Sequence, residues 1–257
     1  LRSILREANI RCNVYTSPHV RTINERFIYN DEVINDNDLS DLLCKIEEVN
    51  DNQPLTYFEA LTAAFFYGCK KYTENLVIAE FGLFGRGDAV NILKKNLCNV
   101  VTSCSEDHLD WLPKNERNIE RIIFEKTSSL LNSNIVIAKQ NSNEITECIK
   151  KNISNNSANK YFFNENYNFV LKENNFFYYE DNYGGLKIPR PNLNGQFQIE
   201  NASTAIATLR ILDDIEIKDQ HIINGIQKAS NIARLEEIKS GKLKDLVKNN
   251  TLILDSS

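Results

Sequence analysis

An apolar run that ends in an acidic residue and a glycine-rich turn limits the possible folds of this chain more than any other segment. Residues 77–91 read VIAEFGLFGRGDAVN, which predicts a buried strand that ends at Glu80 and a turn containing Gly82, Gly85 and Gly87. In open α/β sheets, ligands bind outside the carboxyl ends of the strands, and glycine allows backbone N–H groups to approach a phosphate closely. The segment therefore predicts an α/β fold with a metal-nucleotide site at this strand end.

Two other predicted strands also end in polar residues. Residues 13–15 lead into Ser17, and residues 97–103 lead towards His108. If the strands are parallel neighbours, Ser17, Glu80 and His108 share one edge of the sheet, where a hydroxyl, a carboxylate and an imidazole can hold divalent cations bridged to phosphate oxygens. In isolation, His108 could be a general base oriented by the preceding aspartate, or a helix cap, and Ser17 could be a turn residue. The shared edge favours metal binding.

Composition excludes several classes of partner. A net charge of −5, from 30 Lys+Arg and 35 Asp+Glu, provides no basic footprint for nucleic acid. Six cysteines are scattered without any CxxC spacing, which indicates reduced thiols and a cytoplasmic location. No apolar run is long enough to span a bilayer. We therefore expect a cytoplasmic monomer that binds small molecules, with neither a nucleic-acid nor a membrane partner.

Helical and strand patterns alternate up to about residue 140, which indicates a mostly parallel sheet flanked by helices. The expected helices are residues 1–8, 36–49, 56–71, 118–131 and 143–152. The expected strands are residues 13–16, 76–81, 98–103 and 134–138.

Between residues 160 and 188 the apolar period changes to two, which predicts a small antiparallel β insertion. Its aromatic stripe lacks interleaved basic residues, so a packed sheet face is a simpler interpretation than base stacking. Further helices are expected at residues 202–212 and 218–229, and strands at residues 233–238 and 252–255.

These patterns predict a central domain over residues 1–238, with the antiparallel meander at about residues 160–190. Residues 239–257 are then the start of a second, truncated domain. The chain opens within a helical pattern and closes on a strand pattern, so we expect it to be part of a longer protein.

Two specific motifs are Thr-Ser-Pro-His at residues 16–19 and Gly-Leu-Phe-Gly-Arg-Gly-Asp-Ala-Val-Asn at residues 82–91. Further characteristic segments follow in order at residues 23–26, 55–62, 107–108, 125–126, 195–202 and 233–235. Together they resemble the folylpolyglutamate synthase and dihydrofolate synthase family of the Mur ligase superfamily, along nearly the whole chain. The resemblance implies the α/β fold of the Mur-ligase-like central ATPase domain.

The resemblance also implies an ATP-dependent carbon–nitrogen ligase of folate biosynthesis and one-carbon metabolism. In such an enzyme the carboxylate of a folate or dihydropteroate attacks the γ-phosphate of ATP to form an acyl phosphate, and the amino group of L-glutamate then displaces phosphate. Two Mg²⁺ ions are expected, because the transferring phosphoryl group must be neutralised.

Site residues are carried over from the family by motif. The resemblance implies that Ser17 and Glu80 hold one Mg²⁺, and that His108 and a carbamylated Lys126 are catalytic residues that hold or orient the second. Carbamylation would convert a cationic side chain into an oxygen ligand. The residues expected to contact the nucleotide are Asn201, Arg234 and Asp255.

Departures from the family pattern leave other functions open. Phe197 stands where the family has a histidine, and Phe84 where it has a small residue. The family's phosphate loop would lie before Leu1, so we expect that these residues alone would not turn over ATP. The alternatives are a Mur-type amino-acid ligase and a noncatalytic, degenerate nucleotide-binding domain. The sequence also leaves open whether the acceptor is dihydropteroate or tetrahydrofolate.

Overall fold

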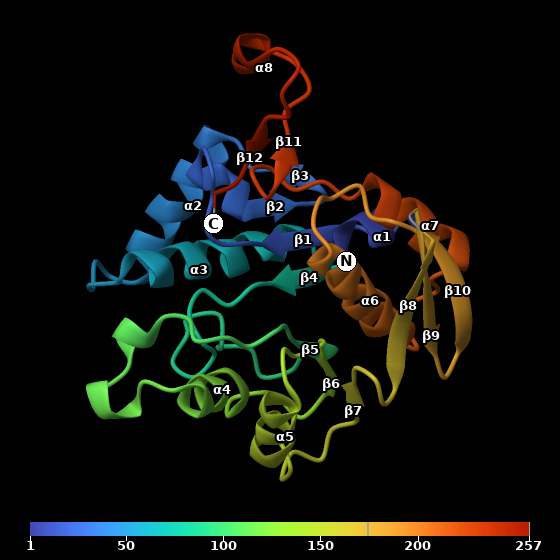
Figure 1. Ribbon diagram of the computed structural model, residues 1–257. Coiled ribbons are helices and arrows are strands. Elements are labelled where there is room, and N and C mark those ends of the chain that lie inside the picture. The colour runs from blue at the N-terminus through green and yellow to red at the C-terminus, as the bar shows by residue number, and fades with distance from the viewer. Residues whose placement is uncertain (174, 257) are drawn as a thin grey trace.

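Two pieces of sheet containing parallel strands form the frame of the molecule in the computed structural model, which describes residues 1–173 and 175–256 (Figure 1). In the first sheet β1 and β4 are parallel, and two short strands continue it antiparallel. Its strands, in spatial order, are β3 (Glu32–Val33), β2 (Phe27–Tyr29), β1 (Cys12–Tyr15) and β4 (Leu76–Ala79). The second sheet is parallel throughout and consists of β5 (Cys98–Val101), β6 (Asn134–Ile137) and β7 (Lys160–Phe162).

Helices surround both sheets (Figure 1). The α-helices are α1 (Arg2–Glu7), α2 (Asp36–Val49), α3 (Tyr57–Gly68), α4 (Ile119–Thr127), α5 (Asn143–Asn152), α6 (Phe197–Arg210), α7 (Asp219–Lys228) and α8 (Lys242–Val247). Short 3₁₀ turns are η1 (Ile23–Arg26), η2 (Cys69–Lys71), η3 (Leu109–Trp111) and η4 (Lys114–Glu116). Among the described residues, no helix has the length and apolar character needed to cross a membrane.

Local capping explains where four of these helices begin. The side chains of Asn35, Asn118 and Ser142 each accept a hydrogen bond from the backbone amide three residues further on. Thr56 and Glu59 form a reciprocal capping box at the start of α3. Such caps satisfy amide donors that the helix itself leaves unpaired. The predicted starts of α2, α3, α4 and α5 are accordingly confirmed to within a residue.

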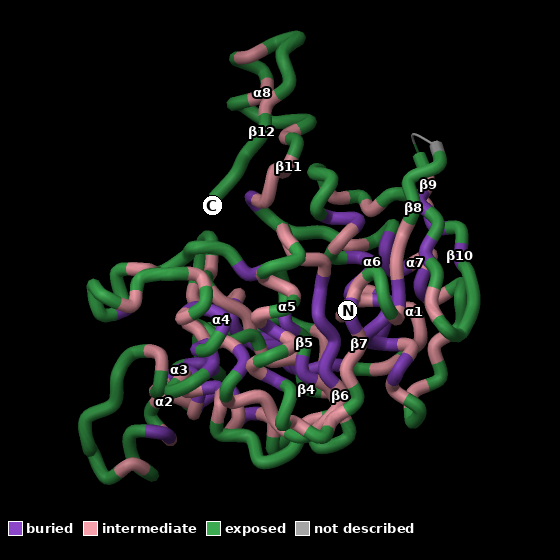
Figure 2. Tube along the Cα trace, turned by 60° about the horizontal axis from the view of Figure 1, so that its bottom comes forward, coloured by how far each residue is buried: buried purple, intermediate pink, exposed green. Residues whose placement is uncertain are grey.

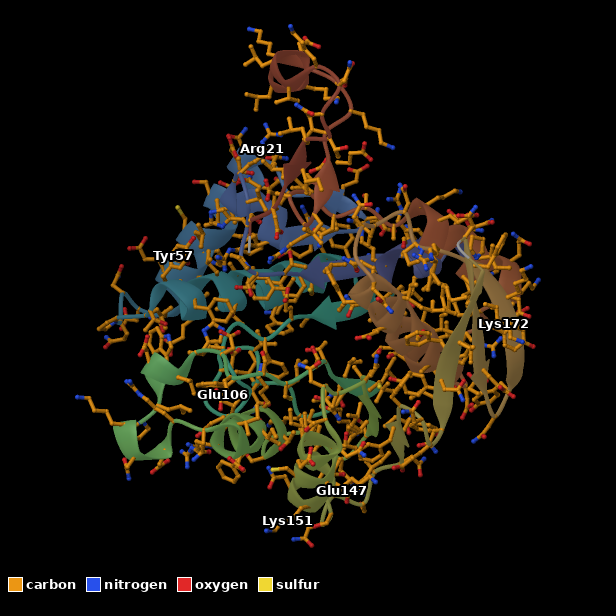
Figure 3. All side chains as sticks on the ribbon, viewed as in Figure 1. Arg21, Tyr57, Glu106, Glu147, Lys151 and Lys172 are labelled. Carbon is orange, nitrogen blue, oxygen red and sulfur yellow. The ribbon has the colours of Figure 1, made fainter. Side chains whose placement is uncertain are left out.

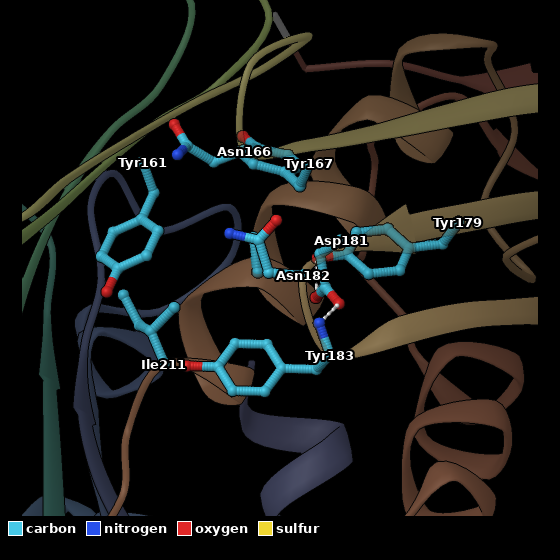
Figure 4. A pocket seen from close by; sticks show the side chains of 9 residues that line it. Tyr161, Asn166, Tyr167, Tyr179, Asp181, Asn182, Tyr183 and Ile211 are labelled. Carbon is cyan, nitrogen blue, oxygen red and sulfur yellow. Dashed lines mark hydrogen bonds between the residues drawn. The ribbon is translucent and has the colours of Figure 1, made fainter.

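The antiparallel meander packs against α6. Its strands are β8 (Tyr167–Glu173), β9 (Phe176–Asp181) and β10 (Gly184–Pro189). Phe177, Tyr179 and Ile188 are almost completely buried there, so one face of the meander is packed, as predicted. The predicted stripe was wrong on β9, because it included Tyr178, which is 37% exposed, whereas Phe177 and Tyr179 form the packed face. A cavity of about 10 Å³ lies among the tyrosine side chains at one end (Figure 4). It has room for about one water molecule and is too small for a base.

Burial is greatest in β1, β2, β6 and α6, whereas β3 and β12 are exposed. Figure 2 shows the buried residues in the interior of the molecule. Beside the first sheet, Tyr15 stacks on Phe65 with ring centroids 5.0 Å apart and meets Phe27 edge-on at 5.7 Å. All three side chains are fully buried. This aromatic cluster holds α3 against the strand that leads into Ser17.

Several predicted boundaries were wrong. Residues 160–162 belong to the parallel sheet rather than to the meander, because they pair with β6, and a period of two does not distinguish the two kinds of sheet. The helix expected from residue 202 begins at Phe197, two residues after Gly195, whose φ is +104°. The strand expected at residues 233–238 is reduced to β11 (Glu236–Glu237), which pairs with β12 (Ile253–Leu254).

The physical reason for the short β11 lies in its backbone. Ala233 and Leu235 have φ values of +51° and +50°, in the left-handed region that a strand cannot contain.

The helix expected to reach residue 131 ends at Thr127 and is followed by two serines, whose side chains compete for backbone hydrogen bonds. The sequence patterns did not predict the short elements β2, β3 and α8.

Candidate functional site

The carboxyl ends of β1 and β4 meet at the same place. The two strands are parallel and in register, with Tyr15 opposite Ala79. The amide of Glu80 donates to the carbonyl of Tyr15 at 3.0 Å, and the amide of Ser17 donates to Oε2 of Glu80 at 3.0 Å. The predicted neighbourhood of Ser17 and Glu80 is therefore confirmed.

The loop that carries Ser17 is held by a single carboxylate. Glu25 accepts hydrogen bonds from the amides of Val20, Arg21 and Thr22, at 2.8, 3.1 and 3.2 Å. These backbone hydrogen bonds, with that from Val20 the largest contribution, lower the pKa of Glu25. Arg21, in this loop, and Tyr57, at the start of α3, both lie at the upper left of Figure 3.

The same loop is joined to Arg26. Its Nε donates to Nδ1 of His19 at 2.9 Å, and its guanidinium lies 5.9 Å from the ring centroid of Tyr57. These contacts fix the loop against β2 and α3. Sequence reasoning did not identify Arg26 as part of the site, although it follows the Ser17 motif closely.

Glu80 experiences opposing electrostatic effects. Desolvation raises its pKa, while the hydrogen bond from the Ser17 amide and the positive charges of Arg234 and Arg26 oppose the rise. Although it belongs to the turn after β4, Glu80 is thus within electrostatic range of Arg234, in the segment before β11. Any cation placed beside Glu80 would stabilise the ionised form of its carboxyl group.

The glycine-rich turn after Glu80 is organised by Asp88. One carboxylate oxygen accepts from the amides of Gly82 and Leu83 at 3.0 and 2.8 Å, and the other accepts from the amide of Val90 at 2.8 Å. Phe84 adopts a φ of +57°, which is uncommon outside glycine. Because Asp88 accepts hydrogen bonds from three amides of the turn, it defines the shape of the turn.

The turn lies directly against α4. Gly85 is buried, and a Cβ atom at this position would be 3.2 Å from the carbonyl oxygen of Lys126 and 3.3 Å from that of Glu125. Only a glycine allows this approach without displacement of the helix backbone. The predicted importance of the glycines is therefore explained at Gly85 by packing.

His108 and Lys126 approach the turn from two directions. The His108 ring meets the Phe84 ring edge-on at 6.2 Å, and its Nε2 lies 3.2 Å from the Asp107 carboxylate. Burial raises the pKa of the Cys104 thiol, an effect that the positive charge of Lys126 opposes, so Lys126 is within electrostatic range of the loop after β5. The exposed His108 thus contacts the turn at Phe84, and the half-buried Lys126 lies beside it through its backbone carbonyl at Gly85.

The assumption that put His108 on one edge with Glu80 was wrong in one respect. In the part of the chain that the structure describes, β4 and β5 are not paired, so the strand before His108 is not a neighbour of the strand before Glu80. Val77 and Val100, on these two strands, are 43% and 37% exposed. Within residues 1–173 and 175–256, no group of three or more His, Cys, Asp or Glu side chains is arranged to hold a metal ion. The metal roles of Ser17, Glu80, His108 and Lys126 remain predictions.

The three predicted nucleotide contacts lie on three segments of the chain, two of which are hydrogen-bonded to each other. Asn201, exposed on α6, donates to Oε1 of Gln198 at 3.2 Å. Asp255 accepts from the amide of Leu235 at 3.4 Å, which joins it to the segment of Arg234. Asn194, which the sequence did not single out, secures that segment by donating to the Leu235 carbonyl at 2.8 Å.

A larger cavity, of about 460 Å³, lies beside the loop after β5 and the first turns of α4 and α5. Glu106, labelled in Figure 3, is among its lining residues. The residues predicted as catalytic, nucleotide-binding or metal-binding do not line it.

Comparison with known proteins adds to this geometry. No family model matches the chain. It is 29% identical to the dihydrofolate synthase/folylpolyglutamate synthase of Haemophilus influenzae over 248 residues, covering 96% of this chain and 54% of that protein. It is 28% identical to the Bacillus subtilis protein of the same name over 257 residues, covering 93% of this chain and 58% of that protein. The chain therefore spans a little over half the length of these relatives.

Solved structures share the fold. Escherichia coli FolC in complex with DHPP and ADP superimposes with a TM-score of 0.86 at 27% identity, covering 100% of this chain and 57% of that one. A bifunctional folylpolyglutamate synthase/dihydrofolate synthase from Yersinia pestis, complexed with AMPPNP and Mn, gives a TM-score of 0.84 at 27% identity, with coverages of 99% and 57%. The α/β architecture predicted from the sequence is confirmed.

Proposed function

We propose that this chain, which is similar to dihydrofolate synthase/folylpolyglutamate synthases along nearly its whole length, is the ATP-binding part of a ligase of that family. The ligase adds L-glutamate to the carboxylate of a folate or dihydropteroate through an acyl phosphate. The observation that carries the proposal is the junction of Ser17 and Glu80 at the ends of two parallel strands, within a fold shared with structures that contain ADP or AMPPNP.

The Ser17–Glu80 junction fits a hard divalent cation. Mg²⁺ prefers oxygen ligands and keeps several waters, so it needs only a few protein groups. The amide of Ser17 binds one oxygen of Glu80, which brings the serine hydroxyl and the carboxylate to the same strand ends. The raised pKa of Glu80 supplies a further reason for a cation to bind. When bound, Mg²⁺ would neutralise phosphate oxygens of ATP.

The chemistry of the proposed reaction needs little covalent participation by the protein. An acceptor carboxylate oxygen forms a bond to the γ-phosphorus and ADP leaves; the glutamate nitrogen then bonds to the acyl carbon, and phosphate and a proton leave. The chain's residues supply positioning and positive charge. His108 and Lys126 would hold or orient the second cation, while Asn201, Arg234 and Asp255 would contact the nucleotide.

We further propose that the protein is a cytoplasmic monomer whose partners are ATP, L-glutamate and a pterin. A Mur-type ligase and a degenerate binding domain remain the rival functions. The Thr-Ser-Pro-His segment at residues 16–19 weighs against the Mur-type ligase. The ordered turn around Asp88 weighs against degeneration of the site.

Phosphate release by the full-length protein tests the proposal. MgATP and L-glutamate are supplied, and dihydropteroate or tetrahydrofolate is added in turn. Pterin-dependent release is expected, and it identifies the acceptor. Folded protein that releases no phosphate with either pterin would contradict the proposal and favour a rival.

A matched pair of variants links that activity to the site. Glu80→Gln is expected to lower kcat by roughly 100-fold, as removal of a group that organises transition-state charge commonly does. Glu74→Gln changes an exposed residue that precedes the same strand and is expected to leave kcat within about twofold. Equal activities in the two variants would remove Glu80 from the mechanism.

A further inference from the structure

A second connection in this region joins the glycine-rich turn to α4 and has no role in the proposed chemistry so far. The amide of Arg86 donates to the carbonyl of Glu125 at 2.9 Å. The Arg86 guanidinium also binds the Glu125 carboxylate through two hydrogen bonds, Nε to Oε2 at 2.9 Å and Nη2 to Oε1 at 2.7 Å. With the close approach of Gly85, the turn therefore contacts the helix in three ways.

Both partners suit a rigid link. Glu125 is 4% exposed, and its carboxylate accepts two hydrogen bonds from the Arg86 guanidinium, so its position is closely constrained. A two-pronged guanidinium–carboxylate pair fixes orientation as well as distance, which a single lysine amine cannot do. These contacts consequently fix the position of the turn relative to α4 at Glu125, the residue that directly precedes Lys126.

A second arginine provides an internal comparison. Arg121 also binds the Glu125 carboxylate, at 2.6 Å, and like Arg86 it lies beside the Phe124 ring, at 5.3 Å against 5.8 Å. Arg121 belongs to α4 itself, one turn before Glu125, and so contributes nothing to the position of the helix relative to the turn. Only Arg86 carries the connection back towards Glu80.

We propose that Arg86 and Glu125 are positioning residues that set the location of Lys126 relative to Glu80, and thereby the geometry in which a divalent cation is held beside the glycine-rich turn. The inference rests on the proposed function, in which both Glu80 and Lys126 serve cations. It assigns to Arg86 a role that differs from phosphate binding, since Nε and Nη2 of its guanidinium both bind the Glu125 carboxylate.

The test compares Arg86→Lys with Arg121→Lys in the full-length protein. Each variant retains a positive charge near Glu125, but only Arg86→Lys removes the two-pronged link between turn and helix. Mn²⁺ binding is measured by electron paramagnetic resonance with Mn²⁺ alone as the probe, and hydrogen exchange is followed at the amides of residues 82–90. Arg86 is an exposed residue, so Arg86→Lys is expected to fold, which circular dichroism checks.

Arg86→Lys is expected to weaken Mn²⁺ binding about 10-fold or more, the effect usual for groups that orient metal ligands, and to accelerate exchange in the turn. Arg121→Lys is expected to change neither. In the turnover assay Arg86→Lys should lower kcat with little change in the KM for the pterin, because the link does not contact that substrate.

The outcomes separate this inference from the proposed function. If the unsubstituted protein turns over the pterin and binds Mn²⁺, but the two variants behave alike, the positioning role is overturned while the function stands. If Mn²⁺ binding responds to Arg86→Lys alone but no pterin is turned over, the function fails and the positioning role stands. If the unsubstituted protein does not bind Mn²⁺, both are overturned.

Discussion

At the scale of single residues, opposing electrostatic effects act on the carboxyl group of Glu80. Its pKa is raised by desolvation, with the Ser17 amide and two arginines opposing the rise. A carboxyl group with a raised pKa contributes stability that is fully present below its ordinary pKa, and this contribution is lost as the pH rises through the raised value. Glu80 is an exposed residue, so solvent screens this effect, and we expect its ionised carboxylate to lower the free energy of unfolding only slightly at neutral pH.

This reasoning predicts the effect of Glu80→Gln on stability. With a chelator present, the variant is expected to have a higher free energy of unfolding than the unsubstituted protein at pH 7, with the difference shrinking as the pH falls through the raised pKa. Urea unfolding at both pH values measures it. A variant that is less stable at pH 7 would show that the hydrogen bond from Ser17 outweighs desolvation.

At the scale of elements, α1 and α7 are packed more closely than side chains would allow. Gly225 of α7 faces the backbone of Ile4, where an added Cβ would lie 2.4 Å from the Cα atom and 2.7 Å from the nitrogen. Ser3 also donates to the carbonyl of Gly225 at 2.7 Å. The glycine therefore sets the distance between two helices that are far apart in the sequence.

Gly225→Ala is expected to lower the free energy of unfolding by about 1–3 kcal/mol. Alanine favours a helix by about 1 kcal/mol over glycine, but here the backbone of α1 must move, and such overpacking costs more than that gain. Gln227→Ala, at an exposed position of the same helix, is the control and should stay within about 0.5 kcal/mol. Chemical denaturation compares them, and a stabilised Gly225→Ala would contradict the close packing.

Across the whole molecule, Arg210 joins the meander to two helices. From the end of α6 it binds Asp181 of β9 at 3.0 Å and Asp219 of α7 at 2.8 Å. The Arg210 and Asp181 side chains are only 11% and 7% exposed, and Tyr179 donates to the second oxygen of Asp181 at 2.7 Å. The ion pair lies where three parts of the fold meet.

Asp181→Asn is expected to lower the free energy of unfolding by about 3 kcal/mol, because removing one partner of a buried ion pair leaves the other charge poorly compensated. Glu147, labelled in Figure 3, is an exposed residue of α5 that pairs with Lys150, and Glu147→Gln is expected to cost less than about 1 kcal/mol. Unfolding in urea measures both. Similar losses of unfolding free energy in the two variants would show that the Arg210–Asp181 ion pair does not stabilise the packing of the meander against α6 and α7.

The sequence by itself determined the features that depend on neighbours along the chain. The starts of α2, α3, α4 and α5 were predicted from the sequence pattern, and the structure shows a capping side chain at each, which binds an amide only a few residues away. The strand ends at Ser17 and Glu80 were recognisable because apolar runs give way there to polar and turn residues. Local chemistry was sufficient for these elements.

Only the tertiary structure decided which distant segments meet. Apolar patterns did not reveal that β7 joins the parallel sheet or that β4 and β5 are unpaired in the described residues, because strand partners are selected by packing over long sequence separations. The approach of Arg234 to Glu80 and the pairing of Arg86 with Glu125 likewise arise from packing of separate elements. The strand ends and the turn of the candidate site were thus encoded locally, whereas their arrangement in space depends on long-range contacts.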